Sequence, residues 1–189
     1  MSSAGDDLAA LVASRLCHDL VSPLGAIGNG IELLELVSPP SPELSLTADA
    51  ARAAQDRLRL YRLGFGIAAA DQSIRGDEVM QIAAGLATNG RLQVAGAIDG
   101  MIPRTQARRL ILAALCAESA LAWGGTVLLS ATTMRAEARR LRHDGEVWSA
   151  LAEGKAPADP TPATIHFTLL AQSGPVRLTQ GEGWLQIAV

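Results

Sequence analysis

The sequence predicts an α+β protein in which a long antiparallel helical hairpin precedes a mixed α/β domain. Two long helical patterns, over about residues 6–36 and 42–70, flank the segment Ser38-Pro39-Pro40-Ser41-Pro42, which cannot continue a helix. After Gly76 the pattern changes to short strands and shorter helices. The chain has 189 residues, 49% of them apolar, which is enough for two small cores. We therefore expect a helical domain over residues 1–75 and an α/β domain over residues 76–189.

The second domain begins with a helix over 77–87 and a strand over 91–98. A long apolar helix follows from near Pro103 to about Ala122, with Thr105 as a candidate cap. Gly124-Gly125 ends this helix. The remaining expected elements are a strand over 126–133, a strand over 137–142 that pairs with it, a Pro-rich loop over 154–162, a helix over 162–172 and strands over 176–179 and 184–189.

An apolar stripe on the first helix predicts self-association. At about 100° per residue, six apolar positions fall on one arc of the helix. They are Leu16, Leu20, Leu24, Ile27, Ile31 and Leu34. Two amphipathic helices bury only one stripe against each other, whereas four helices close a core. We expect a homodimer in which two hairpins form a four-helix bundle.

Composition excludes several classes of function. The formal net charge is −3, so no basic excess indicates a nucleic-acid partner. Cys17 and Cys116 lack metal-ligand spacing, which predicts no metal site and fits a reducing cytoplasm. The polar segment Met1–Leu8 does not resemble a signal peptide, and no uninterrupted apolar run reaches about 18 residues, so no membrane association is expected.

His18 lies on the side of the first helix opposite the apolar stripe, so it is expected to face solvent. A single exposed histidine is usually unremarkable, but its neighbours on this face are small or apolar rather than Lys and Glu. Such a surface suits close docking by another protein. The candidate docking residues are Leu11, Arg15, Val21, Ser22, Gly25 and Asn29 on the first helix and Arg57 and Arg62 on the second. For the arginines, an ordinary solvated face is an equal alternative.

Pro23 and Asp19 complete the candidate site. A proline inside a helix removes a backbone hydrogen bond and usually bends the helix. Because Pro23 lies one turn from His18, we interpret this bend as functional; the alternative is a tolerated kink with no role. Asp19 can hold one imidazole nitrogen as N–H and leave the other free to attack. Because adjacent helix residues do not normally face each other, this contact requires a particular rotamer.

The segment SRLCHDLVSPLG, residues 14–25, resembles the H-box of two-component histidine kinases, with its His-acid-x-x-x-Pro pattern. The longer string SRLCHDLVSPLGAIGNGIELLE, residues 14–35, resembles more narrowly the ChpT family of alphaproteobacterial histidine phosphotransferases. RLRLYRLGFG, residues 57–66, is similar to the second helix of that family.

That resemblance implies a dimerisation hairpin followed by a degenerate domain shaped like the ATP-binding domain of histidine kinases. It implies a phosphotransferase in a two-component phosphorelay. Phosphoryl would pass from a CckA-like hybrid-kinase receiver domain to CtrA-like and CpdR-like response regulators. His18 matches the phosphorylated histidine and Asp19 the adjacent acid. No cofactor is expected on this chain, and Mg²⁺ is expected on the partner receiver domain.

Two other functions remain open from the sequence. An autophosphorylating histidine kinase would share the H-box but needs an ATP site. The long helix carries no Asn near Cys116, and His143-Asp144-Gly145-Glu146 has no second Gly after it, so we expect no ATP binding. A non-catalytic receiver-binding scaffold is the other alternative, although binding alone needs no nucleophile.

Overall fold

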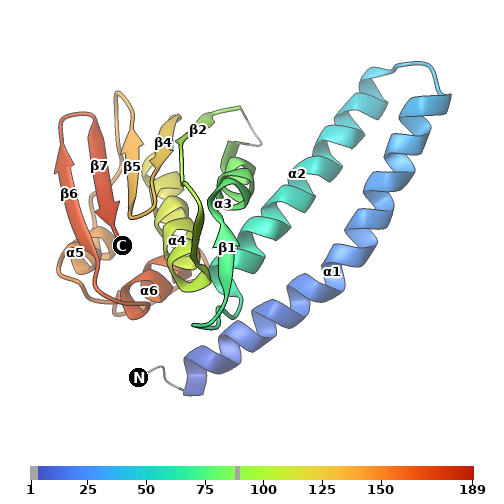
Figure 1. Ribbon diagram of the computed structural model, residues 1–189. Helices are drawn as coiled ribbons and strands as arrows, with labels where there is room; N and C mark the ends of the chain where they lie inside the picture. Colours follow the sequence, from blue (N-terminus) through green and yellow to red (C-terminus); the bar gives the residue numbers. More distant parts are fainter. Residues whose placement is uncertain (1–3, 88–89) are drawn as a thin grey trace.

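The computed structural model describes residues 4–87 and 90–189. Residues 1–3, with which the expected first domain and the polar N-terminus begin, lie outside the described part. Two long helices, α1 (Ala4–Val37) and α2 (Pro42–Phe65), form an antiparallel hairpin (Figure 1). The turn ends at Ser41, whose hydroxyl accepts a hydrogen bond from the Leu44 backbone N–H at 3.1 Å. Pro42 follows at the first helical position, where its missing N–H costs nothing.

Helices α1 and α2 meet along a face that the sequence pattern identifies only in part. Cys17 and Ile31 are buried there, and Gln55 of α2 donates a hydrogen bond to the Leu24 carbonyl at 3.0 Å. Gly28 allows this close approach, because a Cβ there would lie 2.2 Å from the Gln55 amide nitrogen. Most of the expected apolar stripe lies outside this contact with α2. In the single chain, the side chains of the stripe that stay exposed are Leu16, Leu20, Ile27 and Leu34.

The second helix ends at Phe65, five residues before the expected end at Ala70. Gly66 is extended, and its N–H donates to the Arg62 carbonyl at 3.2 Å. A Cβ at Gly66 would lie only 2.4 Å from that carbonyl oxygen, so a glycine is required where the chain leaves the helix. The segment then crosses α1, where the Ile67 N–H donates to the Ser14 hydroxyl at 3.1 Å.

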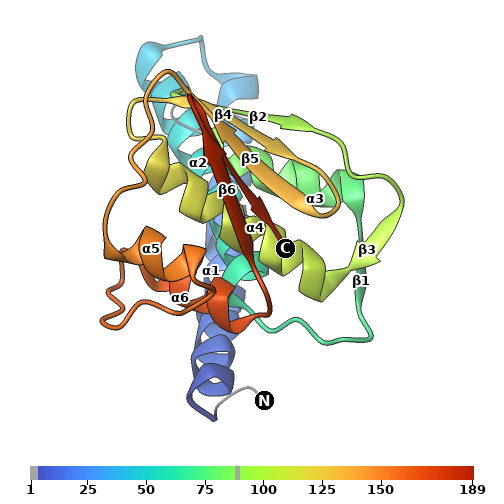
Figure 2. The same cartoon turned by 90° about the vertical axis from the view of Figure 1, so that its left-hand side faces the viewer.

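The rest of the chain is built on a five-stranded sheet with the order β2-β4-β5-β7-β6 (Figure 2). Only β2 and β4 are parallel. The strands are β2 (Leu92–Gly96), β4 (Gly125–Leu129), β5 (Thr133–Glu137), β6 (Arg177–Gly181) and β7 (Trp184–Ala188). A separate two-stranded antiparallel sheet joins β1 (Ser73–Arg75) to β3 (Met101–Pro103).

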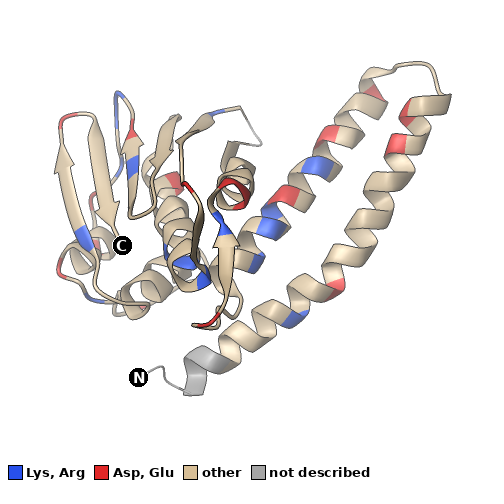
Figure 3. Cartoon of the chain, viewed as in Figure 1, with Lys and Arg blue, Asp and Glu red and all other residues tan. Residues whose placement is uncertain are grey.

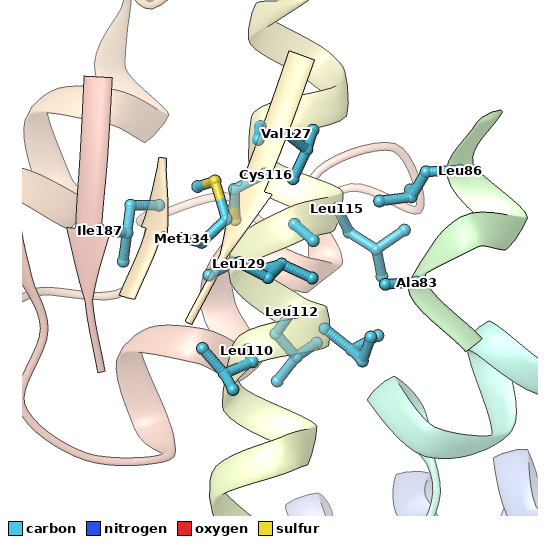
Figure 4. Packing of buried hydrophobic residues seen from close by; sticks show 14 of the residues in the cluster. Ala83, Leu86, Leu110, Leu112, Leu115, Cys116, Val127, Leu129, Met134 and Ile187 are labelled. Carbon is cyan, nitrogen blue, oxygen red and sulfur yellow. The ribbon is translucent and has the colours of Figure 1, made fainter. Parts of the chain in front are cut away.

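Helices cover one face of the five-stranded sheet and give this part of the chain two layers. They are α3 (Gly76–Ala83) with the 3₁₀ turn η1 (Ala84–Ala87), α4 (Arg104–Ala120), α5 (Glu146–Ala152) and α6 (Ile165–Gln172). The long helix α4 is the centre of the core and is buried on nearly all sides. Figure 4 shows Leu112 and Cys116 of α4 among Leu129 and Met134 of the sheet.

Three expectations for this part were wrong. Strand β4 ends at Leu129, and its partner is β5 rather than residues 137–142, because Ser130 and Thr133 close a tight turn. Thr105 does not cap α4; Pro103 occupies the cap position, and no side chain bonds there. The last helix starts at Ile165 rather than 162.

The hairpin is fastened to the sheet part through α2. Arg57 forms an ion pair with Glu118 of α4, with its Nη2 at 2.8 Å from both carboxylate oxygens. Arg108 of α4 donates to the Gly64 carbonyl at 3.0 Å. These polar contacts hold α4 against the C-terminal half of α2.

Candidate functional site

His18 lies in the N-terminal half of α1 and is 79% exposed. The sequence expectation of a solvent-facing imidazole therefore agrees with its position in the structure. Figure 1 shows that α1 bends in its middle, and Pro23 is the proline inside this helix. A missing N–H at Pro23 frees the Asp19 carbonyl from its helical bond, which accounts for a bend one turn beyond His18.

A short chain of hydrogen bonds orients the imidazole. His18 Nδ1 lies 3.1 Å from one oxygen of Asp19, and Arg15 Nε donates to the other oxygen at 2.8 Å. The hydrogen bond from His18, followed by the Arg15 charge, holds the pKa of Asp19 below its usual value. An ionised carboxylate can only accept, so this contact favours the tautomer with the proton on Nδ1.

When the imidazole of His18 is neutral, this contact leaves Nε2 as the nitrogen with the free lone pair. A neutral imidazole with a fixed tautomer and an exposed lone pair is a competent nucleophile near neutral pH. Asp19 also offsets the positive charge that appears on the ring when Nε2 forms a new bond. The site can therefore accept an electrophilic group at Nε2.

The expected docking residues of α1 surround His18 without blocking it. Leu11 is 54% and Val21 42% exposed, and Ser22 and Asn29 are also exposed. Apart from the surrounding turns of α1 itself, no atom of the described residues lies within 4 Å of the position that a Cβ at Gly25 would take. Arg15 is on this face too, but it forms an ion pair with Asp19, which in turn contacts the imidazole of His18.

A cavity of about 620 Å³ opens beside His18, and sequence reasoning missed most of its lining. It is lined by Ser14, His18, Arg62, Ile67, Gln72, Ser73 and Arg104. Of these, only His18 and Arg62 were singled out as site residues from the sequence. Arg104 comes from the start of α4, more than 80 positions along the chain. Only the pairing of β1 with β3 brings it next to Ser73, through the register Ser73 to Pro103.

Arg57 does not belong to this surface, which corrects the sequence expectation. Its guanidinium is only 31% exposed and pairs with Glu118, which is 22% exposed. It also donates to the Tyr61 hydroxyl at 3.1 Å. Arg57 is therefore a connector between the hairpin and α4 rather than a free docking group.

Over residues 4–87 and 90–189, no group of three or more His, Cys, Asp or Glu side chains could hold a metal ion. On α4, where a kinase would need a metal-binding side chain, Cys116 is buried and burial raises the pKa of its thiol. Glu118, the nearby carboxylate, is already paired with Arg57. His143-Asp144-Gly145 forms the loop that leads into α5.

Comparisons with known proteins agree with this geometry. Residues 76–174 match the family model described as the histidine phosphotransferase C-terminal domain. A 62-residue stretch is 48% identical to the protein phosphotransferase ChpT of Brucella abortus (strain 2308) and covers 33% of this chain and 30% of that protein. The match thus spans less than a third of that curated relative.

A solved structure of a bacterial phosphotransferase superposes with a TM-score of 0.64 at 25% sequence identity. The superposition covers 100% of this chain and 97% of the other, so the hairpin and the sheet part are both included. Because the family model matches more than half of the residues, the chain belongs to the histidine phosphotransferase family.

Proposed function

We propose that this protein relays phosphoryl groups through His18, from the receiver domain of a hybrid histidine kinase to the receiver domains of response regulators. The observation that carries the proposal is the exposed imidazole whose Nδ1 is held by Asp19. Membership of the phosphotransferase family and the likeness to ChpT support the same chemistry.

The transfer balances without a cofactor on this chain. The Nε2 lone pair of His18 attacks the phosphorus of an aspartyl phosphate on the receiver. A new N–P bond forms as the P–O bond breaks, and its electron pair leaves with the aspartate carboxylate. The Nδ1 proton stays on the ring, and the resulting positive charge is offset by Asp19. Transfer to a response regulator is the same exchange in reverse.

The division of labour between the proteins follows from the chemistry of phosphoryl transfer. Catalysis consists mostly of in-line positioning and charge stabilisation. The receiver domain supplies the aspartate and a divalent cation such as Mg²⁺. The small and apolar residues around His18, among them Val21, Ser22 and Gly25, let the receiver approach within bonding distance.

The test is transfer of labelled phosphoryl from a phosphorylated receiver domain. We expect His18→Ala to abolish labelling of this chain while circular dichroism stays unchanged, because truncating an exposed side chain removes little packing. His143→Ala and His166→Ala are the controls and should remain labelled. Persistent labelling of His18→Ala, with loss in one of the two controls, would contradict the assignment.

The same assay separates the alternatives. Incubation with labelled ATP and Mg²⁺ alone should leave the chain unlabelled, because α4 offers no free metal-binding carboxylate. Label on His18 from ATP would instead identify an autophosphorylating kinase. Stable receiver binding without any label would identify a scaffold.

A further inference from the structure

Two arginines beside His18 have no carboxylate partner among the residues that the structure describes. Arg62 of α2 and Arg104 of α4 line the same cavity as the imidazole. The neighbouring arginines are occupied: Arg15 pairs with Asp19, Arg59 with Asp56, and Arg57 with Glu118. Within residues 4–87 and 90–189, neither Arg62 nor Arg104 forms an ion pair, although both lie at the surface where the proposed chemistry takes place.

Contacts with neighbouring segments position both arginines near α1. Arg104 is held at its backbone, where its N–H donates to the Gln72 carbonyl at 2.8 Å. Gln72 and Ser73 belong to the segment that is fastened to α1 through Ser14. Arg62 lies close enough to α1 for its charge to lower the pKa of Cys17, against the larger raising effect of burial. Cys17 immediately precedes His18.

Both arginines also line a second cavity of about 590 Å³ between α2, α3 and α4, where Glu78 supplies one carboxylate against Arg59, Arg62 and Arg104. They therefore lie at the junction of two adjoining hollows. Figure 3 shows basic positions on the C-terminal half of α2 and at the start of α4. The site next to His18 is cationic although the chain as a whole carries a net charge of −3.

A phosphoryl group on Nε2 would bring about two negative charges and three acceptor oxygens to this cavity. Guanidinium groups bind such oxygens through short, charge-assisted hydrogen bonds, often in pairs. Arg62 is exposed and Arg104 is half-buried, so both guanidinium groups are accessible from this cavity, and an anion between them would be attracted by both charges.

We propose that Arg62 and Arg104 form an anion clamp that holds the phosphoryl oxygens of phosphorylated His18. The sheet part, through Arg104, then completes a phosphohistidine site that the hairpin alone would lack. The inference rests on the proposed function, since it requires phosphorylation of His18. The competing reading is that the two arginines bind an acidic surface of the receiver.

The test loads His18 without any receiver. Phosphoramidate, whose P–N bond breaks as ammonia leaves, phosphorylates the full-length chain, and ³¹P NMR follows the phosphoryl resonance against pH. Adjacent cations favour the dianion, so we expect the phosphoryl pKa to rise by about one unit in Arg62→Gln and Arg104→Gln. Hydrolysis of the phosphohistidine should change in the same variants. Arg104→Lys keeps the charge and should recover part of the shift.

Arg177→Gln, on the edge strand β6, is the matched control and should behave as the parent chain. An unchanged phosphoryl pKa in both cavity variants, with His18 loaded normally, would overturn the clamp and leave the proposed function intact. If the variants lose only the transfer from a phosphorylated receiver and keep the parent phosphoryl pKa, the arginines act in receiver docking. That result also overturns the clamp. Failure of the parent chain to load at His18, even from a phosphorylated receiver, would remove both proposals.

Discussion

Asp19 has two contacts that define its role at the scale of single residues. One oxygen contacts His18 Nδ1, and the other accepts from Arg15 Nε. Because Asp19 is itself exposed, we expect it to orient the imidazole rather than to stabilise the fold. Its effect should therefore appear in the rate of transfer and not in unfolding.

We predict that Asp19→Asn slows phosphoryl acceptance about tenfold to a hundredfold, which is the loss typical when a carboxylate that orients a metal-bound imidazole is replaced. An amide can donate as well as accept, so the Nδ1–H tautomer loses its preference. ¹⁵N NMR of the His18 ring and transfer rates measure the two effects. Arg15→Gln, which reaches His18 only through Asp19, should cost less. Equal transfer rates in the parent chain and Asp19→Asn would show that the contact between His18 Nδ1 and Asp19 does not contribute to transfer.

The sequence was sufficient for the residues of this site that lie on one helix. The exposure of His18 and its contact with Asp19 follow from helical spacing and one rotamer. Arg104, Gln72 and Ser73 could not be found this way, because they reach the cavity through the pairing of β1 with β3. Arg57 was misassigned because helical spacing does not reveal Glu118 across the junction.

At the scale of elements, local signals were reliable where they were strong. The turn between α1 and α2 was placed correctly because Pro39, Pro40 and Pro42 exclude a helix and Ser41 caps the next one. The end of α2 was missed because Ala68–Ala70 favour helix, whereas the chain turns at Gly66. Strands β1 and β3, three residues each, carry no alternation that could be recognised.

At the junction between α2, α4 and α6, the buried imidazole of His166 is expected to make the stability of the fold fall at acidic pH. Burial, and then the charge of Arg57, lower the pKa of His166 to about 4. Its Nε2 has no hydrogen-bond partner in the part of the chain that the structure describes, and its ring lies 4.8 Å from that of Phe167. The unfolded chain therefore binds more protons than the folded one between pH 6.5 and about 4, so stability is full above this window and falls as the pH drops through it.

We predict that lowering the pH from 7 to 5 costs about 2 kcal/mol through this one group, and that His166→Leu removes this cost. Urea unfolding of the parent chain and the variant at both pH values gives the difference, in which all other titrating groups cancel. The same pH dependence in both proteins would mean that His166 is solvated and protonates freely in the folded state.

At the scale of the whole molecule, α1 leaves an apolar face that the single chain does not cover. Most of the large exposed apolar side chains of the described residues lie on this helix. By length and composition alone, the segment Leu8–Val37 could also cross a membrane. Three faces must therefore be distinguished on α1: one packs on α2, one carries His18, and the third includes Leu16, Leu20 and Ile27.

The third face is the one that a second hairpin would cover, because it lies beside the α2 contact and away from His18. A membrane is the poorer partner, since Arg15, Asp19, Glu32 and Glu35 interrupt the same helix with charge.

We predict a dimer in solution that Leu16→Glu or Ile27→Glu weakens by at least tenfold in Kd, because each change would bury a carboxylate between two hairpins. Asn29→Glu, on the His18 face, is the control and should leave the dimer intact. Light scattering across micromolar concentrations measures the mass, and flotation with vesicles tests the lipid alternative. A folded monomer in the parent chain, or co-flotation that the two glutamate variants abolish, would show that the third face serves something other than a second copy.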